Sequence, residues 1–136
     1  MLFRSNYGFI PQTLGDDLDP LDILLLSQVA IEPLCLVYGK VIGVMRMIDG
    51  GKEDDKIIAV AKTDASVNHI DTIDQVPEYL HREMKHFFEE YTRLENKTVT
   101  VDAFQGLDVA YSIIQKAADA YSNVYGAGSS ATASNP

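Results

Sequence analysis

The chain has 136 residues, an apolar content of 46% and a formal net charge of -9. This length favours one domain with a single modest core, and the acidic balance excludes nucleic acid as an expected partner because phosphate backbones select basic surfaces. No apolar run approaches a membrane span, so we expect no membrane partner. Cys35 is the single cysteine, and we expect it to be a small buried residue of a strand in a reducing compartment, with the cytoplasm as the default location.

The two ends of the chain differ in character from the middle. Residues 1–5 carry neither a targeting pattern nor a recognisable strand, and we interpret them as a non-native N-terminus joined to a truncated reading frame. Residues 6–125 form the expected domain. Residues 126–136 are mostly glycine, alanine and serine with nothing to bury, which predicts a disordered tail.

Predicted strands fill the first half of the chain. Residues 6–11 mix turn formers with aromatic and β-branched residues, which indicates a short strand entering a bend. The apolar run 23–26 predicts a buried strand, and residues 34–48 predict a strand with a bulge or bend at a glycine. The polar stretch 49–56 leads into a strand over 57–61, and the simplest interpretation of this pair is a hairpin.

The second half of the chain has a helical period. Apolar residues recur at three- and four-residue steps over 78–95 and again over 107–121, which predicts two amphipathic helices with a short strand at 99–101 between them. Tyr91 lies on the apolar stripe of the first helix, so periodicity alone favours a core tyrosine there. Strands followed by helices indicate an α+β fold, mainly β, in which a sheet or barrel is flanked by two C-terminal helices.

The strongest chemical pattern is an acidic turn, in which Asp17, Asp19 and Asp22 fall within six residues. Pro20 fixes its own φ and biases Asp19 toward an extended conformation, so the carboxylates lie on a stiff turn. Carboxylates this close repel one another, and a hard divalent cation offsets that repulsion. An exposed acidic loop explains the triplet equally well, whereas an EF-hand is excluded because its acid and glycine positions are not matched.

The acidic turn and the hairpin together offer a set of metal and phosphate ligands. If the two segments face each other, one cavity would hold Asp17, Asp19, Asp22, Asp49 and Asp54, with Lys56, Tyr7 and Tyr91 as donors nearby. Several carboxylates can bind two or more divalent ions, which suits an in-line displacement at phosphorus because one ion generates the nucleophilic water and the others screen the substrate's charge. Spacing alone leaves this a hypothesis.

Four motifs, in this order and at these separations, resemble the soluble family I inorganic pyrophosphatases. They are Asn-Tyr-Gly-Phe-Ile-Pro at 6–11, the acidic turn at 17–22, Met-Ile-Asp at 47–49 followed by Asp54 and Lys56, and His-Phe-Phe-Glu-x-Tyr at 86–91. The resemblance covers residues 6 to about 121. It implies an OB-like five-stranded barrel with external helices, here without its N-terminal strands, and inorganic diphosphatase activity: Mg2+-dependent hydrolysis of pyrophosphate to two orthophosphates.

The same resemblance implies metal ligands. Asp17, Asp22 and Asp54 resemble the ligands of the tighter, activating metal site. Asp49, again with Asp54, resembles a ligand for metal that arrives with the substrate. Mg2+ is the implied cofactor.

The resemblance also implies catalytic and substrate-binding roles. Asp19 resembles the carboxylate that activates the attacking water, and Tyr7 matches a tyrosine beside the nucleophile. Lys56 and Tyr91 match positions that contact phosphate. Because the family forms dimers or hexamers, a homo-oligomer is expected.

Three departures from the family pattern support an alternative. The family's active site also uses two glutamates, a lysine and an arginine upstream of residue 6, where this sequence has only five residues. Leu18 stands where the family has a small or polar residue, and Thr92 follows Tyr91 where the family usually has lysine. The alternative is a non-catalytic metal-binding remnant or interaction protein of the same fold, inactive because the upstream substrate-binding residues are absent.

Overall fold

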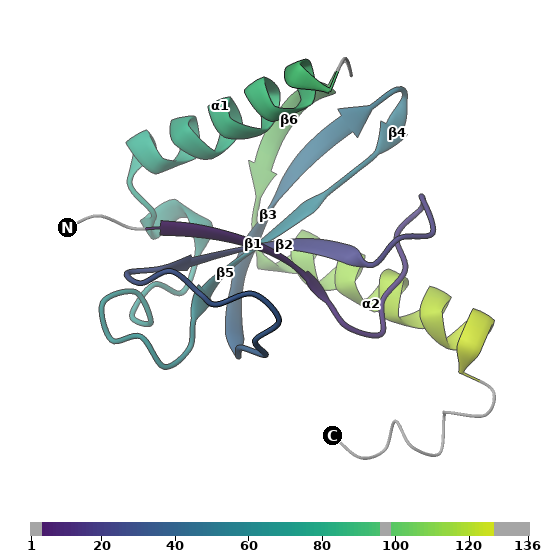
Figure 1. The fold of residues 1–136 in the computed structure, drawn as a ribbon, viewed down its shortest axis with the longest axis horizontal. Helices are drawn as coiled ribbons and strands as arrows, with labels where there is room; N and C mark the ends of the chain where they lie inside the picture. Colours follow the sequence, from purple (N-terminus) through teal and green to yellow (C-terminus); the bar gives the residue numbers. More distant parts are fainter. Residues whose placement is uncertain (1–3, 96–98, 127–136) are drawn as a thin grey trace.

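The computed structural model describes residues 4–95 and 99–126 and consists of one sheet with two long helices (Figure 1). The elements follow in the order β1 (Arg4–Ile10), β2 (Leu21–Ser27), β3 (Gly39–Asp49), β4 (Lys52–Glu53), β5 (Lys56–Ala61), the short 3-10 helix η1 (Ile73–Gln75), α1 (Glu78–Leu94), β6 (Val99–Gln105) and α2 (Leu107–Tyr125). The predicted mixed α+β class and both predicted helices are confirmed. Within the described ranges, no helix is long and apolar enough to cross a membrane.

The six strands found in residues 4–95 and 99–126 belong to one mixed sheet. Its order is β1-β2-β5-β3-β4, and β6 pairs with β3. β2 and β5 are parallel, whereas β3 and β5 form the predicted antiparallel hairpin. Among the described residues β1 pairs only with β2 and β6 only with β3, so the structure shows a six-stranded sheet and no closure into the predicted five-stranded barrel.

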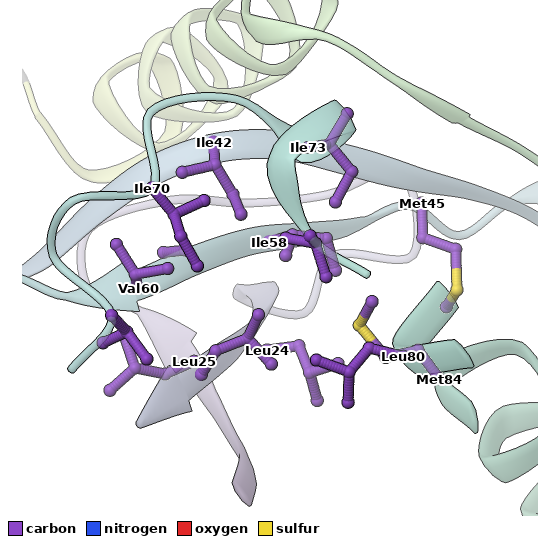
Figure 2. Close-up of a cluster of buried hydrophobic side chains, with 14 of the residues drawn as sticks. Leu24, Leu25, Ile42, Met45, Ile58, Val60, Ile70, Ile73, Leu80 and Met84 are labelled. Carbon is purple, nitrogen blue, oxygen red and sulfur yellow. The ribbon is translucent and has the colours of Figure 1, made fainter. Parts of the chain in front are cut away.

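Apolar side chains cover both faces of the sheet. On one face Leu24, Met45 and Ile58 pack against Leu80 and Met84 of α1 (Figure 2). On the other face the strands pack against small residues of α2, in a cluster made of Leu21, Val44, Ile57, Ala110 and Ala117. Each leucine or isoleucine side chain that is fully buried in this way contributes about 1.5–3 kcal/mol. The sheet is thereby fixed between the two helices, and its strand ends are held in place for the site described below.

β3 differs in its start from the predicted strand. It begins at Gly39, and the preceding residues form an exposed loop in which Leu34 has a φ of 67°. Cys35 lies in this loop and is exposed, so the expectation of a buried strand cysteine is wrong. The predicted irregularity at a glycine is confirmed, because the register of β3 against β5 shifts between Val41 and Gly43. A Cβ atom on Gly43 would lie 2.7 Å from the carbonyl oxygen of Gln105, so this position has no room for a side chain.

The ends of the chain are only partly described. Arg4 and Ser5 belong to β1 and pair with Ser27 and Leu26, so the expectation that the first five residues form no strand is wrong for these two. Their non-native origin stays a prediction. The predicted disordered tail lies outside the described residues, except that Gly126 ends α2 as its C-cap.

Candidate functional site

A buried lysine joins the acidic turn to the hairpin. Lys56 begins β5 and is 5% exposed. Its Nζ donates hydrogen bonds to Asp22 Oδ2 at 2.5 Å and to Asp54 Oδ1 at 2.9 Å. Asp22 and Lys56 are register partners on the parallel strands β2 and β5, so their side chains share one face of the sheet. The structure therefore brings together three of the predicted site residues, Asp22, Asp54 and Lys56.

The charge of this cluster is unbalanced. Burial by itself would lower the pKa of Lys56, but the hydrogen bonds and charges of Asp22 and Asp54 outweigh burial and raise that pKa above its ordinary 10.5. The ammonium therefore stays charged at neutral pH. One positive charge between two carboxylates leaves a net negative charge, and such a cluster favours a further cation.

Tyr7 of β1 covers the lysine. Its ring packs edge-on against Phe88 of α1 at 5.6 Å between centroids, and Lys56 Nζ lies 5.7 Å from the centroid of each ring. Burial, reinforced by the nearby Asp22 carboxylate and only partly offset by Lys56, raises the pKa of Tyr7 to about 12. The phenol therefore keeps its proton at neutral pH and acts as a hydrogen-bond donor.

Tyr91 does not lie on the buried face of α1. It is 49% exposed and stacks on Phe87, which contacts Phe88 in turn. The core-tyrosine interpretation is therefore wrong. Thr92 takes the inward position instead, where it is buried and its hydroxyl donates to the carbonyl oxygen of Phe88 at 2.7 Å. Within the described residues, the ring contacts link Tyr91 to the Lys56 cluster only through Phe87 and Phe88.

The acidic turn is anchored by a buried threonine at its base. Thr13 Oγ1 donates to the carbonyl oxygen of Ile10 at 2.6 Å and accepts from the backbone N–H of Leu21 at 3.0 Å. Further along, the backbone N–H of Gly15 donates to the carbonyl oxygen of Asp19 at 2.8 Å. These bonds connect the end of β1 to the start of β2, and they hold the carboxylates beside the strand ends.

Leu18 has an unfavourable backbone conformation at the tip of this turn. Its φ is 67°, and its side chain is 74% exposed. A left-handed conformation brings Cβ close to the following carbonyl oxygen and costs about 1–2 kcal/mol for a residue of this kind. This φ gives a backbone reason for the small or polar residue that the resemblance implies at this position.

A Leu18→Asn substitution is expected to stabilise the fold by about 1 kcal/mol, because asparagine tolerates the left-handed region. Urea denaturation would measure the change in the free energy of unfolding. Leu36→Asn is the matched control, since Leu36 is also an exposed loop leucine but has no positive φ. Equal effects of the two substitutions would show that backbone strain at Leu18 is not the cause.

A pocket of about 110 Å³ lies between the acidic turn, the segment that connects β4 to β5, and α2. Its polar lining consists mainly of carboxylates, contributed by Asp16, Asp17, Asp22, Glu53, Asp54 and Asp55. Asp17, Asp22 and Asp54 thus line one pocket, and their common role as metal ligands stays a prediction. Asp19, in the turn, and Asp49, at the end of β3, are not among the described lining residues.

The donor set of this pocket fits a hard cation chemically. Carboxylate oxygens are the ligands that Mg2+ and Ca2+ prefer. Across residues 4–95 and 99–126, however, no three acidic, histidine or cysteine side chains are arranged to hold an ion as they stand. Asp17 is exposed, and its Oδ1 accepts from the backbone N–H of Asp19 at 3.1 Å, so metal binding requires this side chain to rotate toward Asp22 and Asp54.

Sequence reasoning missed the carboxylate next to Asp54. The side chain of Asp55 is 8% exposed and accepts from Arg46 Nε at 2.8 Å. Burial raises the pKa of Asp55 even though Arg46 opposes that shift. The signal that the sequence offered was a single arginine inside the apolar run 41–48 of β3, together with acidic residues at 53, 54 and 55 on the returning segment.

The comparisons with known proteins agree on one family. The model of the family described as inorganic pyrophosphatase matches residues 1–122. The chain is 42% identical to soluble inorganic pyrophosphatase 4 of Arabidopsis thaliana over 90% of its own length, and 44% identical to soluble inorganic pyrophosphatase PPA1 of Solanum tuberosum over 89%. In each case it spans 57% of the relative, so it covers little more than half the length of these proteins.

Solved structures give the same result. The inorganic pyrophosphatase of Helicobacter pylori is similar with a TM-score of 0.80 and 40% identity, over 85% of this chain and 69% of that one. The Thermus thermophilus inorganic pyrophosphatase also has a TM-score of 0.80, at 37% identity, over 85% of this chain and 68% of that one. On the family match and these likenesses, the chain belongs to the inorganic pyrophosphatase family.

Proposed function

We propose that the chain carries out Mg2+-dependent hydrolysis of inorganic pyrophosphate to two orthophosphates. The observation that carries this proposal is the pocket lined by Asp17, Asp22 and Asp54, with Lys56 bound to Asp22 and Asp54. Pyrophosphate carries several negative charges. Carboxylates that can bind metal ions, next to a lysine ammonium that can bind phosphate, suit such a substrate and agree with the chain's membership of the inorganic pyrophosphatase family.

The proposed metal ligands are Asp17, Asp22 and Asp54, with Asp49 joining Asp54 for metal that accompanies the substrate. When bound, Mg2+ would neutralise phosphate charge and lower the pKa of a coordinated water. Lys56 Nζ has three donors, of which two are used by Asp22 and Asp54, so one remains for a phosphate oxygen.

The remaining residues have proposed roles in proton transfer and orientation. Asp19 would take the proton of the attacking water, because its carboxylate is exposed at the tip of the turn. Tyr7 keeps its proton and would donate a hydrogen bond beside the nucleophile. Tyr91 would contact phosphate through its hydroxyl, which its exposed position permits.

Three further proposals concern the whole protein. An OB-like barrel would require additional strands to connect β1 with β6, each of which pairs with one strand among the described residues. A homo-oligomer follows the family expectation, and a cytoplasmic location is the default expectation. The naming of the relatives as soluble inorganic pyrophosphatases supports a location outside the membrane.

Orthophosphate release from pyrophosphate tests the proposed function. The 136-residue chain and a version extended upstream by the corresponding segment of the Solanum tuberosum relative would be assayed with Mg2+ and with excess chelator. Activity in both chains supports the proposal for this polypeptide. Activity in the extended chain alone assigns groups that catalysis needs to the upstream segment, and no activity in either chain favours the non-catalytic metal-binding alternative.

Asp54→Asn is expected to raise the Mg2+ concentration needed for half-maximal activity by about tenfold or more. Even the mutation of a residue that only supports a metal ligand lowers metal affinity or activity by about 10–100-fold. Asp22→Asn should act in the same direction, because each substitution removes one ligand charge. A Mg2+ titration of phosphate release measures the effect. Asp74→Asn, an exposed aspartate of η1, is the control, and unchanged titrations for both site variants would contradict the metal assignment.

A further inference from the structure

Arg46 makes three side-chain contacts around the segment that presents Asp54. Its Nε donates to Asp55 Oδ1 at 2.8 Å, its Nη2 lies 3.5 Å from Glu53 Oε2, and its Nη1 donates to Gln105 Oε1 at 3.4 Å. The guanidinium therefore links β3, β6 and both neighbours of Asp54. A planar group with donors in fixed directions can hold several partners in one arrangement.

Neighbouring side chains of this segment point to opposite sides. Glu53 and Asp55 contact Arg46, whereas Asp54 contacts Lys56, which is the alternation typical of a strand. The backbone of Asp54 is also fixed, because its N–H donates to the carbonyl oxygen of Met47 at 3.0 Å. Asp54 is thus held through both neighbours and through its own amide.

The geometry points to Arg46 as a positioning residue for Asp54, acting through Glu53 and Asp55. This inference rests on the proposed metal-binding role of Asp54. Without the guanidinium, the Asp55 carboxylate, only 8% exposed, would lose its cation and move toward water. Since Asp54 is the adjacent residue, that movement would displace a metal ligand, and displacements near 1 Å are costly at such sites.

Mn2+ binding to the 136-residue chain, followed by electron paramagnetic resonance, tests this inference without using catalysis. Arg46→Gln is expected to weaken Mn2+ binding by about tenfold, in the range found for residues that support metal ligands. In an Asp54→Asn background the same substitution should have no further effect, because the residue that Arg46 positions is already lost. Arg93→Gln is the matched control, since it removes an exposed arginine–carboxylate pair on α1.

Two results would overturn the role of Arg46. One is an Arg46→Gln chain with a lower melting temperature but the parent's Mn2+ affinity, which would make Arg46 merely structural. The other is a loss of Mn2+ affinity on Arg46→Gln that is the same in the parent and in the Asp54→Asn background. If Arg46→Gln does not fold, Arg46→Lys replaces it: lysine keeps the charge but cannot bridge the same three partners, so weaker binding than in the parent is expected and parent-like binding contradicts the inference.

The proposed function and this inference can fail separately. A chain that binds Mn2+ through Asp54 and Arg46 but releases no orthophosphate would contradict the proposed hydrolysis and support the positioning role. Mn2+ binding that does not depend on Asp54 would overturn the positioning role, whatever the activity.

Discussion

An Asp19→Asn chain is expected to lose turnover by about 10²–10⁴-fold while its Mg2+ requirement stays close to that of the parent. Asp19 lies on the acidic turn but is not among the described residues lining the pocket shared by Asp17, Asp22 and Asp54. Its backbone N–H, rather than its carboxylate, is bonded to Asp17. Asparagine preserves the size of the side chain but cannot accept the proton of an attacking water, so the loss should fall on the chemical step.

The two quantities come from one data set. Phosphate release at a series of Mg2+ concentrations gives both the saturating turnover and the half-maximal Mg2+ concentration, in whichever of the two chains described above is active. Asp54→Asn provides the contrast, because a metal ligand should change the Mg2+ requirement. Equal losses of turnover and Mg2+ affinity in the Asp19 variant would argue against a separate role as base.

The local elements could be predicted from the sequence because each has a pattern of its own. The apolar run after the acidic turn predicts β2, and apolar residues at three- and four-residue steps predict α1 and α2. The start of β3 could not be placed in this way. The residues before Gly39 are apolar enough for a strand, but the chain bends there and Leu34 adopts a positive φ that propensity does not reveal.

The buried face of α1 shows that an error of one residue in a helical pattern changes which side chain is predicted to be buried. Its buried positions are Leu80, Met84, Phe88 and Thr92, which follow one another at four-residue steps. Tyr91 is one residue away from this row and so lies about 100° around the helix. A polar threonine at the end of the row is invisible to a hydrophobic pattern, which is why the buried position was assigned to the wrong residue.

The site itself depends on contacts between distant parts of the chain. Asp22 and Lys56 meet because β2 and β5 are parallel neighbours, and no local pattern encodes that pairing. The spacing of the acidic residues made Asp22 and Lys56 candidates, and the family resemblance implied their roles, whereas periodicity predicted only the strands that carry them. The resemblance gave no role to Arg46 or Asp55, whose contact is seen only once β3 and β5 are placed side by side.

A Lys56→Met substitution is expected to reduce the free energy of unfolding by about 2–4 kcal/mol, measured by urea denaturation without divalent metal. Removing one partner of a fully buried ion pair costs about 3–5 kcal/mol. The loss here should be somewhat smaller, because Asp22 and Asp54 each keep 27% of their side-chain surface exposed and water can partly solvate them. Lys116→Met is the matched control: that lysine lines the same pocket, but its pair with Asp16 is long, at 3.7 Å, and exposed.

Mg2+ should recover part of this loss if Asp22 and Asp54 are metal ligands. In the parent, Lys56 already neutralises some of their repulsion, so a bound cation adds less. In the Lys56→Met chain the two carboxylates face each other without a shared cation, and Mg2+ stabilises the folded state according to its affinity for that state. The urea midpoint should therefore rise more with Mg2+ in the Lys56 variant than in the parent or the Lys116 variant. An equal rise of the urea midpoint in all three chains would mean that Mg2+ binds elsewhere. The carboxylates of Asp22 and Asp54 would then serve only to bind Lys56.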